Sequence, residues 1–384
     1  MPPAGRRAYL DHNATTPPRA EVVEAMTRCL RDAWGNPSSV HPWGEDARLL
    51  VERVRRDVAR AIGAPAPAGI TFTSGGTEAD NLALRGLARL ARDQRRASRI
   101  VTVATEHAAV LDTCRDLADR EGFRVDVLPV DGEGRLSPAA LADALTKDTA
   151  LVAVMAANNE TGVLQDIPGL AAEARAAGAL LFTDAVQCSG RVPVDVRAWG
   201  VDAAAFSAHK CGGPKGAGAL WLREGLSIGA TQTGGGQEGG LRGGTENVAG
   251  IVGLGIALRL AVQEQPSAAV AMREAREALW AAARRAYPRA TRNSPEDGCL
   301  PNTLNVSFPG RDGRQLVADL GREGIALSAA SACHSHGHAR SHVLVAMGLD
   351  DARLDGAVRV SAGPATTADD VAAFEDALRR VLAG

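Results

Sequence analysis

Residues 180–216 read LLFTDAVQCSGRVPVDVRAWGVDAAAFSAHKCGGPKG and contain two short apolar runs, Leu180–Thr183 and Ala203–Ser207. Each run leads into polar residues, a pattern typical of strands that are buried on both faces of a sheet. Similar runs lie along the chain on either side, at Ile70–Thr73, Ile100–Val103, Val125–Val130, Leu151–Ala156 and Ala217–Leu222. Helix-like stretches separate most of these runs. The region therefore predicts an α/β fold with a mostly parallel, seven-stranded, doubly wound sheet covered by helices.

The sequence after this region changes character. A glycine-rich segment, Gly234–Gly244, precedes two stretches with helical periodicity, Asn247–Gln263 and Ala268–Ala286. The elements expected beyond them are a strand at Thr303–Phe308, a helix near Gly313–Glu323, a strand at Ile325–Ser328 and a last helix capped by Thr367. We therefore expect a large domain over residues 16–249. Residues 1–15 and 250–384 are expected to form a smaller α+β domain.

The composition excludes several classes of protein. With 45% hydrophobic and 23% charged residues, the chain resembles an ordinary globular protein and neither a disordered tail nor a coiled coil. A net charge of −2 gives no general reason to expect a nucleic acid or a membrane surface as partner. The chain shows neither a secretory signal nor an apolar run of about 18 residues. Its six cysteines form no C-x-x-C pair, so we expect a reduced, cytoplasmic protein.

Lysine is scarce in this chain. Only Lys147, Lys210 and Lys215 occur among 43 cationic residues, and the rest are arginines. Arginine does not give up its proton in proteins and cannot form a Schiff base, so a lysine at the end of a buried strand stands out. Lys210 directly follows the run Ala203–Ser207 and is our candidate. For Lys215, a solvated loop charge is an equally good explanation.

Two further segments complete a set. Residues 70–80 read ITFTSGGTEAD, a strand, a glycine turn and a helix start whose free N–H groups and hydroxyls suit a phosphate. Asp184 ends another predicted strand. Pyridoxal phosphate needs a lysine for its aldehyde, an acid for its pyridinium nitrogen and a cradle for its phosphate. Taken alone, the glycine turn could be an ordinary one capped by Thr77, and Asp184 a helix N-cap; together with Lys210 they predict pyridoxal 5'-phosphate as cofactor.

Longer motifs strengthen this prediction. They are YLDHNATTP (9–17), NPSSVH (36–41), TSGGTEADN (73–81), TEHAAVLD (105–112), NNETG (158–162), DAVQ (184–187), SAHKCGGPKG (207–216), RGGTEN (242–247), SACHS (331–335) and VRVSAG (358–363). With these motifs the chain resembles the cysteine desulfurases of the NifS/IscS type, in the class V branch of fold-type I pyridoxal-phosphate enzymes. The resemblance extends from Tyr9 to about Val381.

The resemblance implies a role for each matching residue. Lys210 binds the cofactor covalently and later moves the Cα proton, and Cys333 is the nucleophile. Asn159 and Arg359 receive the substrate carboxylate, which suits the arginine fork. The remaining roles are contacts to the cofactor: Asp184 to the ring nitrogen, His107 to the ring face, Gln187 to the phenolic oxygen, Gly76, Thr77, Ser207 and His209 to the phosphate, and Thr245 to the phosphate from the partner subunit. The resemblance also implies that Asn159 contacts the cofactor and that His107 is one of the catalytic residues.

The implied reaction takes sulfur from L-cysteine. The Cys333 thiolate attacks the substrate sulfur, and the products are L-alanine and a persulfide on Cys333. An acceptor protein in iron–sulfur cluster assembly or thio-modification then receives the sulfur. The use of Thr245 across an interface implies a homodimer.

Two features leave alternatives open. The segment CHSHGHARSH (333–342) holds four of the eight histidines, which could tune Cys333, bind a metal or be solvated without a special role; we assign no metal site. The same scaffold would also suit a selenocysteine lyase, another class V enzyme or a non-catalytic sulfur or metal carrier. Cys211 departs from the family pattern, and we expect it to be a small buried hydrophobe.

Overall fold

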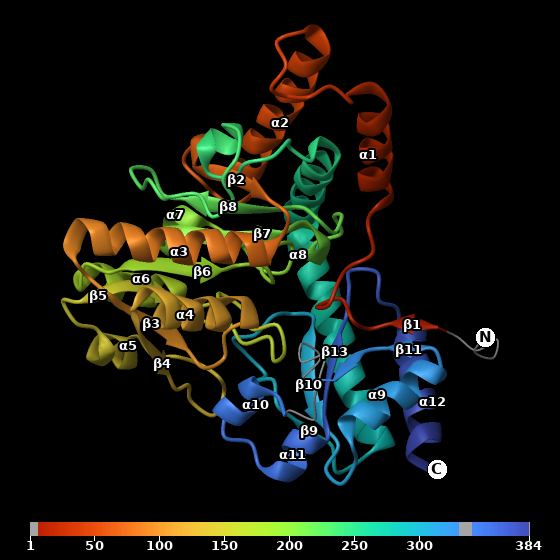
Figure 1. Ribbon diagram of the computed structural model, residues 1–384. Coiled ribbons are helices and arrows are strands. Elements are labelled where there is room, and N and C mark those ends of the chain that lie inside the picture. The colour runs from red at the N-terminus through yellow and green to blue at the C-terminus, as the bar shows by residue number, and fades with distance from the viewer. Residues whose placement is uncertain (1–6, 330–339, 384) are drawn as a thin grey trace.

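The computed structural model describes residues 7–329 and 340–383. Its centre is a seven-stranded sheet (Figure 1), and the strands lie in the spatial order β2, β8, β7, β6, β5, β3, β4. Only β8 runs antiparallel to its neighbours, which confirms the mostly parallel sheet. The strand bounds are β2 Ile70–Thr73, β3 Arg99–Val103, β4 Arg124–Leu128, β5 Thr149–Ala153, β6 Leu180–Asp184, β7 Ala203–Ser207 and β8 Gly218–Leu222.

Helices cover both faces of this sheet, because its strands carry apolar side chains on both sides. On one face α3 (Gly76–Arg95) and α4 (Ala108–Glu121) pack against the sheet and bury residues such as Leu84 and Leu117. On the other face the apolar sides of α2 (Pro42–Ala61), α6 (Ile167–Ala176) and α8 (Val248–Ala286) form a second cluster. The other helices of this part are α1 (Ala20–Asp32), α5 (Pro138–Ala144) and α7 (Val196–Trp199).

A smaller α+β unit lies beside the sheet (Figure 1). It has a four-stranded sheet in the order β12, β13, β10, β9 and a separate parallel pair, β1 with β11. The elements are β1 Ala8–Tyr9, β9 Thr291–Arg292, β10 Thr303–Ser307, α9 Gly313–Arg322, β11 Ile325–Ala326, β12 Ser328–Ala329, α10 His342–Ala346, α11 Asp351–Asp355, β13 Ala357–Ser361 and α12 Ala368–Ala383. As predicted, Thr367 and Asp370 bond each other at the start of α12.

Two predicted elements differ from the structure. The two helices expected on either side of Pro266 are one helix, α8, in which Pro266 is an interior residue. Burial on both sides offsets the cost of this proline, because Leu258 packs in the cluster of the large sheet and Leu279 in that of the small unit. By length and composition alone, α8 could cross a membrane. However, 56% of its most apolar 18-residue stretch is buried inside the protein, as in a core helix.

The second difference lies at Ile325–Ser328, where one strand was expected. The chain instead changes sheets at Leu327: β11 pairs with β1, whereas β12 pairs with β13. The N-terminal segment also joins the small unit, since Ala8 and Leu10 lie in its apolar cluster. The proposed domain limits stay a prediction, because α8 belongs to both clusters.

Candidate active site

A cavity of about 320 Å³ lies at the carboxyl ends of β6 and β7, facing the small unit. This is where a doubly wound sheet usually binds its ligands. The cavity is lined by all the predicted site residues except Thr245 and Cys333: Gly76, Thr77, His107, Asn159, Asp184, Gln187, Ser207, His209, Lys210 and Arg359. The sequence therefore identified the members of one site from six separate segments.

Lys210 lies in a 3₁₀ turn, Ala208–Lys210, immediately after β7. Its Nζ donates hydrogen bonds to the backbone oxygens of Asn13 (2.7 Å) and Ala14 (2.9 Å). These carbonyls hold the amine at the cavity wall, where an aldehyde could reach it. The neighbouring Cys211 is buried, and burial raises the pKa of its thiol to about 12, so it is the inert small side chain that the sequence predicted.

Asp184 ends β6, the strand next to β7. Its Oδ1 accepts a hydrogen bond from the backbone N–H of Val186 at 2.8 Å. The next helix, α7, begins only at Val196, so the alternative of a helix N-cap is wrong. Burial raises the pKa of the Asp184 carboxyl. A cationic ring nitrogen in the cavity would offset this penalty and keep the carboxylate charged.

The start of α3 fits a phosphate. The N-cap residue, Gly75, makes no side-chain cap bond, and Thr77 is already in the first turn, so Thr77 does not cap the helix. Ser207 Oγ is buried and has no hydrogen-bond partner within the described residues. A Cβ on Gly76 would lie 2.7 Å from a methyl group of Val186, so the cradle admits only glycine without a shift. Unpaired donors around a glycine turn match the needs of a phosphate.

Two histidines on the cavity wall are held as neutral rings. His107 Nδ1 accepts a hydrogen bond from Ala109 N–H at 3.1 Å, and burial lowers the pKa of this histidine. Burial, followed by the nearby Lys210 charge, lowers the pKa of His209 to about 4. His209 Nδ1 lies 3.2 Å from Thr15 Oγ1. A neutral His107 ring suits stacking on an aromatic cofactor, because it brings no charge to be desolvated.

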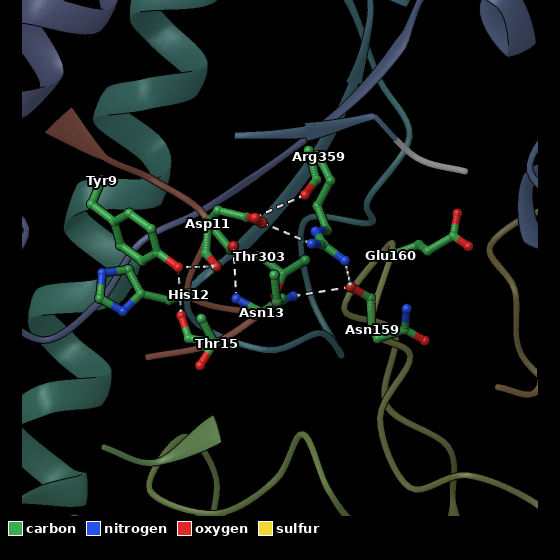
Figure 2. A network of polar contacts seen from close by, with 12 residues as sticks. Tyr9, Asp11, His12, Asn13, Thr15, Asn159, Glu160, Thr303 and Arg359 are labelled. Atoms are coloured by element: carbon green, nitrogen blue, oxygen red, sulfur yellow. Dashed lines mark hydrogen bonds and ion pairs between the residues drawn. The ribbon is translucent and has the colours of Figure 1, made fainter. Parts of the chain in front are cut away.

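Figure 2 shows how Arg359 is held in β13, between the N-terminal segment and the loop after β5. Its Nη2 pairs with Asp11 Oδ1 at 2.8 Å, and its Nη1 donates to the backbone oxygen of Asn159 at 3.2 Å. The side chain is buried, and within the described residues its Nε has no partner. Arg359 thus lines the cavity with a guanidinium that is not saturated by partners in the described residues, which suits a receptor for a carboxylate.

Several residues of the site had no role in the sequence analysis. Asp11 and Asn13 come from the motif at 9–17, and Glu160 from the motif at 158–162; these motifs were noted without assigning these side chains a function. Arg191 is buried and contacts Gln187 Oε1 and the backbone oxygen of His12. For Asp11, Asn13 and Glu160 the signal was a polar residue inside a strong motif, whereas Arg191 lies outside the quoted motifs. The contacts themselves join segments far apart in the sequence.

Two predicted residues stand apart. Thr245 is exposed and does not line the cavity of its own chain, and its role across a subunit interface stays a prediction. Cys333, with His334, His336 and His338, lies outside the described residues. His342 is described, and its Nε2 lies 2.9 Å from the backbone oxygen of Glu106. Within residues 7–329 and 340–383, no cluster of three or more His, Cys, Asp or Glu side chains is arranged to hold a metal ion.

Comparisons with known proteins agree with this geometry. The family described as "Aminotransferase class-V" matches residues 8–374. The chain is 41% identical to "Cysteine desulfurase IscS" of Dictyoglomus turgidum, over 98% of this chain and 95% of that protein. A solved structure described as a NifS-like protein superposes with a TM-score of 0.92 at 38% identity, over 98% of this chain and all of the other. Another, "SspA in complex with cysteine", gives 0.81 at 32%, over 94% of this chain and all of the other.

The matches extend over nearly the whole chain, and the resemblance found in the motifs is confirmed. Fold-type I architecture, dependence on pyridoxal phosphate and desulfurase chemistry follow from the same comparisons. Of the functions that the sequence analysis considered, the comparisons support cysteine desulfurase. The chain belongs to the class V aminotransferase family and, within it, to the pyridoxal-phosphate-dependent cysteine desulfurases of the NifS/IscS type.

Proposed function

We propose that this chain takes the sulfur of L-cysteine at the cavity around Lys210 and transfers it to Cys333. The observation that carries the proposal is the position of Lys210 Nζ in one cavity with Asp184, Ser207 and Arg359. Lys210 would hold the cofactor covalently, Asp184 its ring nitrogen and Ser207 its phosphate. Bound there, pyridoxal phosphate supplies an electron sink for charge that develops on the substrate Cα.

The side chains would divide the remaining work. Arg359 and Asn159 bind the substrate carboxylate and so orient the Cα–H bond toward Lys210, which takes and later returns the proton. The Cys333 thiolate attacks the substrate sulfur. A sulfur–sulfur bond forms while the bond between Cβ and sulfur breaks. Its electron pair stays with the Cβ side, which is protonated to give alanine, and Cys333 keeps the persulfide.

Two variants test this assignment. Cys333→Ala is expected to abolish alanine and persulfide formation from L-cysteine and to keep the yellow colour of the bound cofactor. Lys210→Ala is expected to lose the absorption band that borohydride bleaches. Sustained alanine production by Cys333→Ala would show that another group attacks the sulfur, and an unchanged band in Lys210→Ala would move the covalent link elsewhere.

We infer that the active form is a homodimer. Trp34, Val40 and Trp43 are each more than half exposed, and the Trp34 and Trp43 rings stack at 6.3 Å on the α1–α2 side of the molecule. Such a cluster of exposed apolar side chains is typical of an interface. Thr245 follows the glycine-rich segment, which borders a cavity of about 1050 Å³ beside α2. The exposed position of Thr245 next to this cavity supports the proposal that Thr245 reaches the cofactor phosphate bound by the partner subunit.

Mixed dimers test the role of Thr245. A subunit with Lys210→Ala and a subunit with Thr245→Ala are combined. If Thr245 acts across the interface, one complete site forms and activity rises above that of either parent dimer. If Thr245 acts within its own subunit, no complete site forms and no such recovery occurs.

The acceptor and the location are also proposals. We propose that the persulfide passes to a protein of iron–sulfur cluster assembly or of thio-modification, in the cytoplasm. The described cysteines are all free thiols, which suits a reducing compartment. Trapping of mixed disulfides between the persulfide enzyme and host proteins would identify the acceptor. Recovery of secreted proteins alone would contradict this location. The net charge still predicts neither a nucleic acid nor a membrane as a direct partner.

A further inference from the structure

Ser341 makes two contacts at the start of α10. Its Oγ accepts a hydrogen bond from Leu344 N–H at 3.2 Å and thereby caps the helix. The same hydroxyl donates to Glu160 Oε2 at 2.5 Å. Both side chains are buried, with Ser341 4% and Glu160 6% exposed. The contact therefore excludes water, and a buried carboxyl is costly to leave without its partner.

Glu160 belongs to the substrate side of the site. It follows Asn159, whose backbone oxygen accepts hydrogen bonds from Arg359 (3.2 Å) and Asn13 (3.1 Å). Its own backbone is fixed by Asn158, which accepts from Glu160 N–H at 2.9 Å. Figure 2 shows the Glu160 side chain pointing away from Arg359. One short loop thus carries a substrate-binding residue and, next to it, the anchor of Ser341.

Ser341 is close to Cys333 in the sequence, and the stretch that contains Cys333, residues 330–340, connects β12 to Ser341. On that side Ser328 Oγ donates to Asp11 Oδ2 at 2.9 Å, and the other oxygen of Asp11 holds Arg359. Next to Ser341, His342 Nε2 lies 2.9 Å from the backbone oxygen of Glu106. The described residues on both sides of the stretch that contains Cys333 are therefore bonded to Asp11, Glu160 and Glu106. These three residues hold or directly precede or follow residues that line the cavity: Arg359, Asn159 and His107.

We propose that Glu160 is a positioning residue for sulfur transfer: through Ser341 it fixes the C-terminal end of the Cys333 segment in register with the Asn159–Arg359 carboxylate site. This inference rests on the proposed function of Cys333. It assigns Glu160 no contact with substrate or cofactor. Its consequence is a separation of two reactions, because the holoenzyme moves the Cα proton with Lys210 and Arg359 and without Cys333, whereas Cys333 must also be in place to take the sulfur.

The test compares two rates in the holoenzyme. The first is alanine formation from L-cysteine, which needs Cys333. The second is exchange of the Cα hydrogen of L-alanine with deuterium in D₂O, which needs Lys210 and Arg359 and not Cys333. The variants are Glu160→Ala, Ser341→Ala and the double variant, with the conservative Glu160→Gln as a rescue. Ser137→Ala is the matched control, because Ser137 caps α5 by accepting from Ala140 N–H at 3.1 Å, in a contact that resembles the cap of α10.

We expect Glu160→Ala and Ser341→Ala each to slow alanine formation by about tenfold, which is the effect of one lost hydrogen bond to a carboxyl group. Deuterium exchange should stay within about twofold of the wild type, because the groups that move the proton are intact. The double variant should be no slower than the worse single variant, since both changes remove the same contact. Glu160→Gln should recover most of the rate, because its amide still meets the Ser341 hydroxyl, and Ser137→Ala should leave both rates unchanged.

Other results would overturn the inference. If deuterium exchange fell as much as alanine formation, Glu160 would only support the carboxylate site. If the two single effects multiplied in the double variant, the residues would act independently. Cys333→Ala, measured in parallel, separates this failure from that of the proposed function: it should lose alanine formation and keep exchange, whatever the Glu160 variants do.

Discussion

The ionisation of Glu160 makes the stability of the protein depend on pH in a way that one substitution removes. Burial raises the pKa of Glu160 from 4.5 to about 7, although Ser341 and Arg359 oppose the shift. A carboxyl group whose pKa is higher in the folded state binds its proton more tightly there. It therefore stabilises the fold fully below pH 4.5, and this contribution is lost as the pH rises through about 7.

The size of the effect follows from the two pKa values. Between about pH 5.5 and about pH 8 the wild-type protein should lose about 2 kcal/mol through this group. Glu160→Gln, which imitates the protonated form, does not lose it. For 384 residues, unfolding with an entropy of about 2 cal/mol/K per residue converts this difference to about 2–3 °C in Tm. The Tm of the variant relative to wild type should rise by that amount between the two pH values.

The assay is thermal unfolding of the holoenzyme at both pH values with cofactor in excess. Asp80 and Glu106 are also buried carboxyls with raised pKa values, but they are present in both proteins and cancel in the difference. Glu224→Gln, which removes a carboxylate from an exposed site, serves as the control. A difference between Glu160→Gln and wild type that stays constant from about pH 5.5 to about pH 8 would refute the reasoning.

Three further substitutions have definite expected outcomes. Lys210→Arg keeps a cation beside the Asn13 and Ala14 carbonyls but cannot bind an aldehyde, so the borohydride-sensitive absorption band and alanine formation should both vanish; a retained band counts against Lys210. Asp11→Asn removes the ion pair that holds Arg359, so steady-state kinetics should show the KM for L-cysteine rising about tenfold with a smaller change in kcat. An unchanged KM would be evidence against Asp11 as the residue that positions Arg359. Gly76→Ala places a Cβ 2.7 Å from Val186 and should weaken cofactor affinity in a fluorescence titration, whereas adding Val186→Ala should restore it; no recovery would mean that the clash is not the cause.

Local patterns predicted the sheet well, because each strand carries its own signal. Ile70–Thr73 and Ala203–Ser207 are strands with the bounds that their apolar runs indicate. The cavity could be predicted for a related reason: in a parallel sheet the residues that follow neighbouring strands meet at one edge. Asp184 and Lys210 come together in this way without any knowledge of the long-range contacts.

The parts that could not be predicted depend on contacts between distant segments. Asp11 holds Arg359 across 348 positions of sequence, and no local periodicity reports such a pair. The change of sheets at Leu327 likewise depends on which strands β11 and β12 find as partners. Pro266 predicted a break in α8 that burial against two separate clusters prevents. In each case the tertiary partner outweighs the local signal.

The N-terminal segment has a consequence for how the enzyme is made on the ribosome. Tyr9 to Thr15 supply the carbonyls that hold Lys210 and the carboxylate that holds Arg359, so a segment that is translated long before Lys210 and Arg359 completes the catalytic centre. The pairing partners of this segment, Ala326 for Tyr9 and Ser361 for Asp11, are translated much later. The early segment must therefore wait until β13 has emerged, and a nascent chain truncated before β13 would have its central sheet residues but no functional centre.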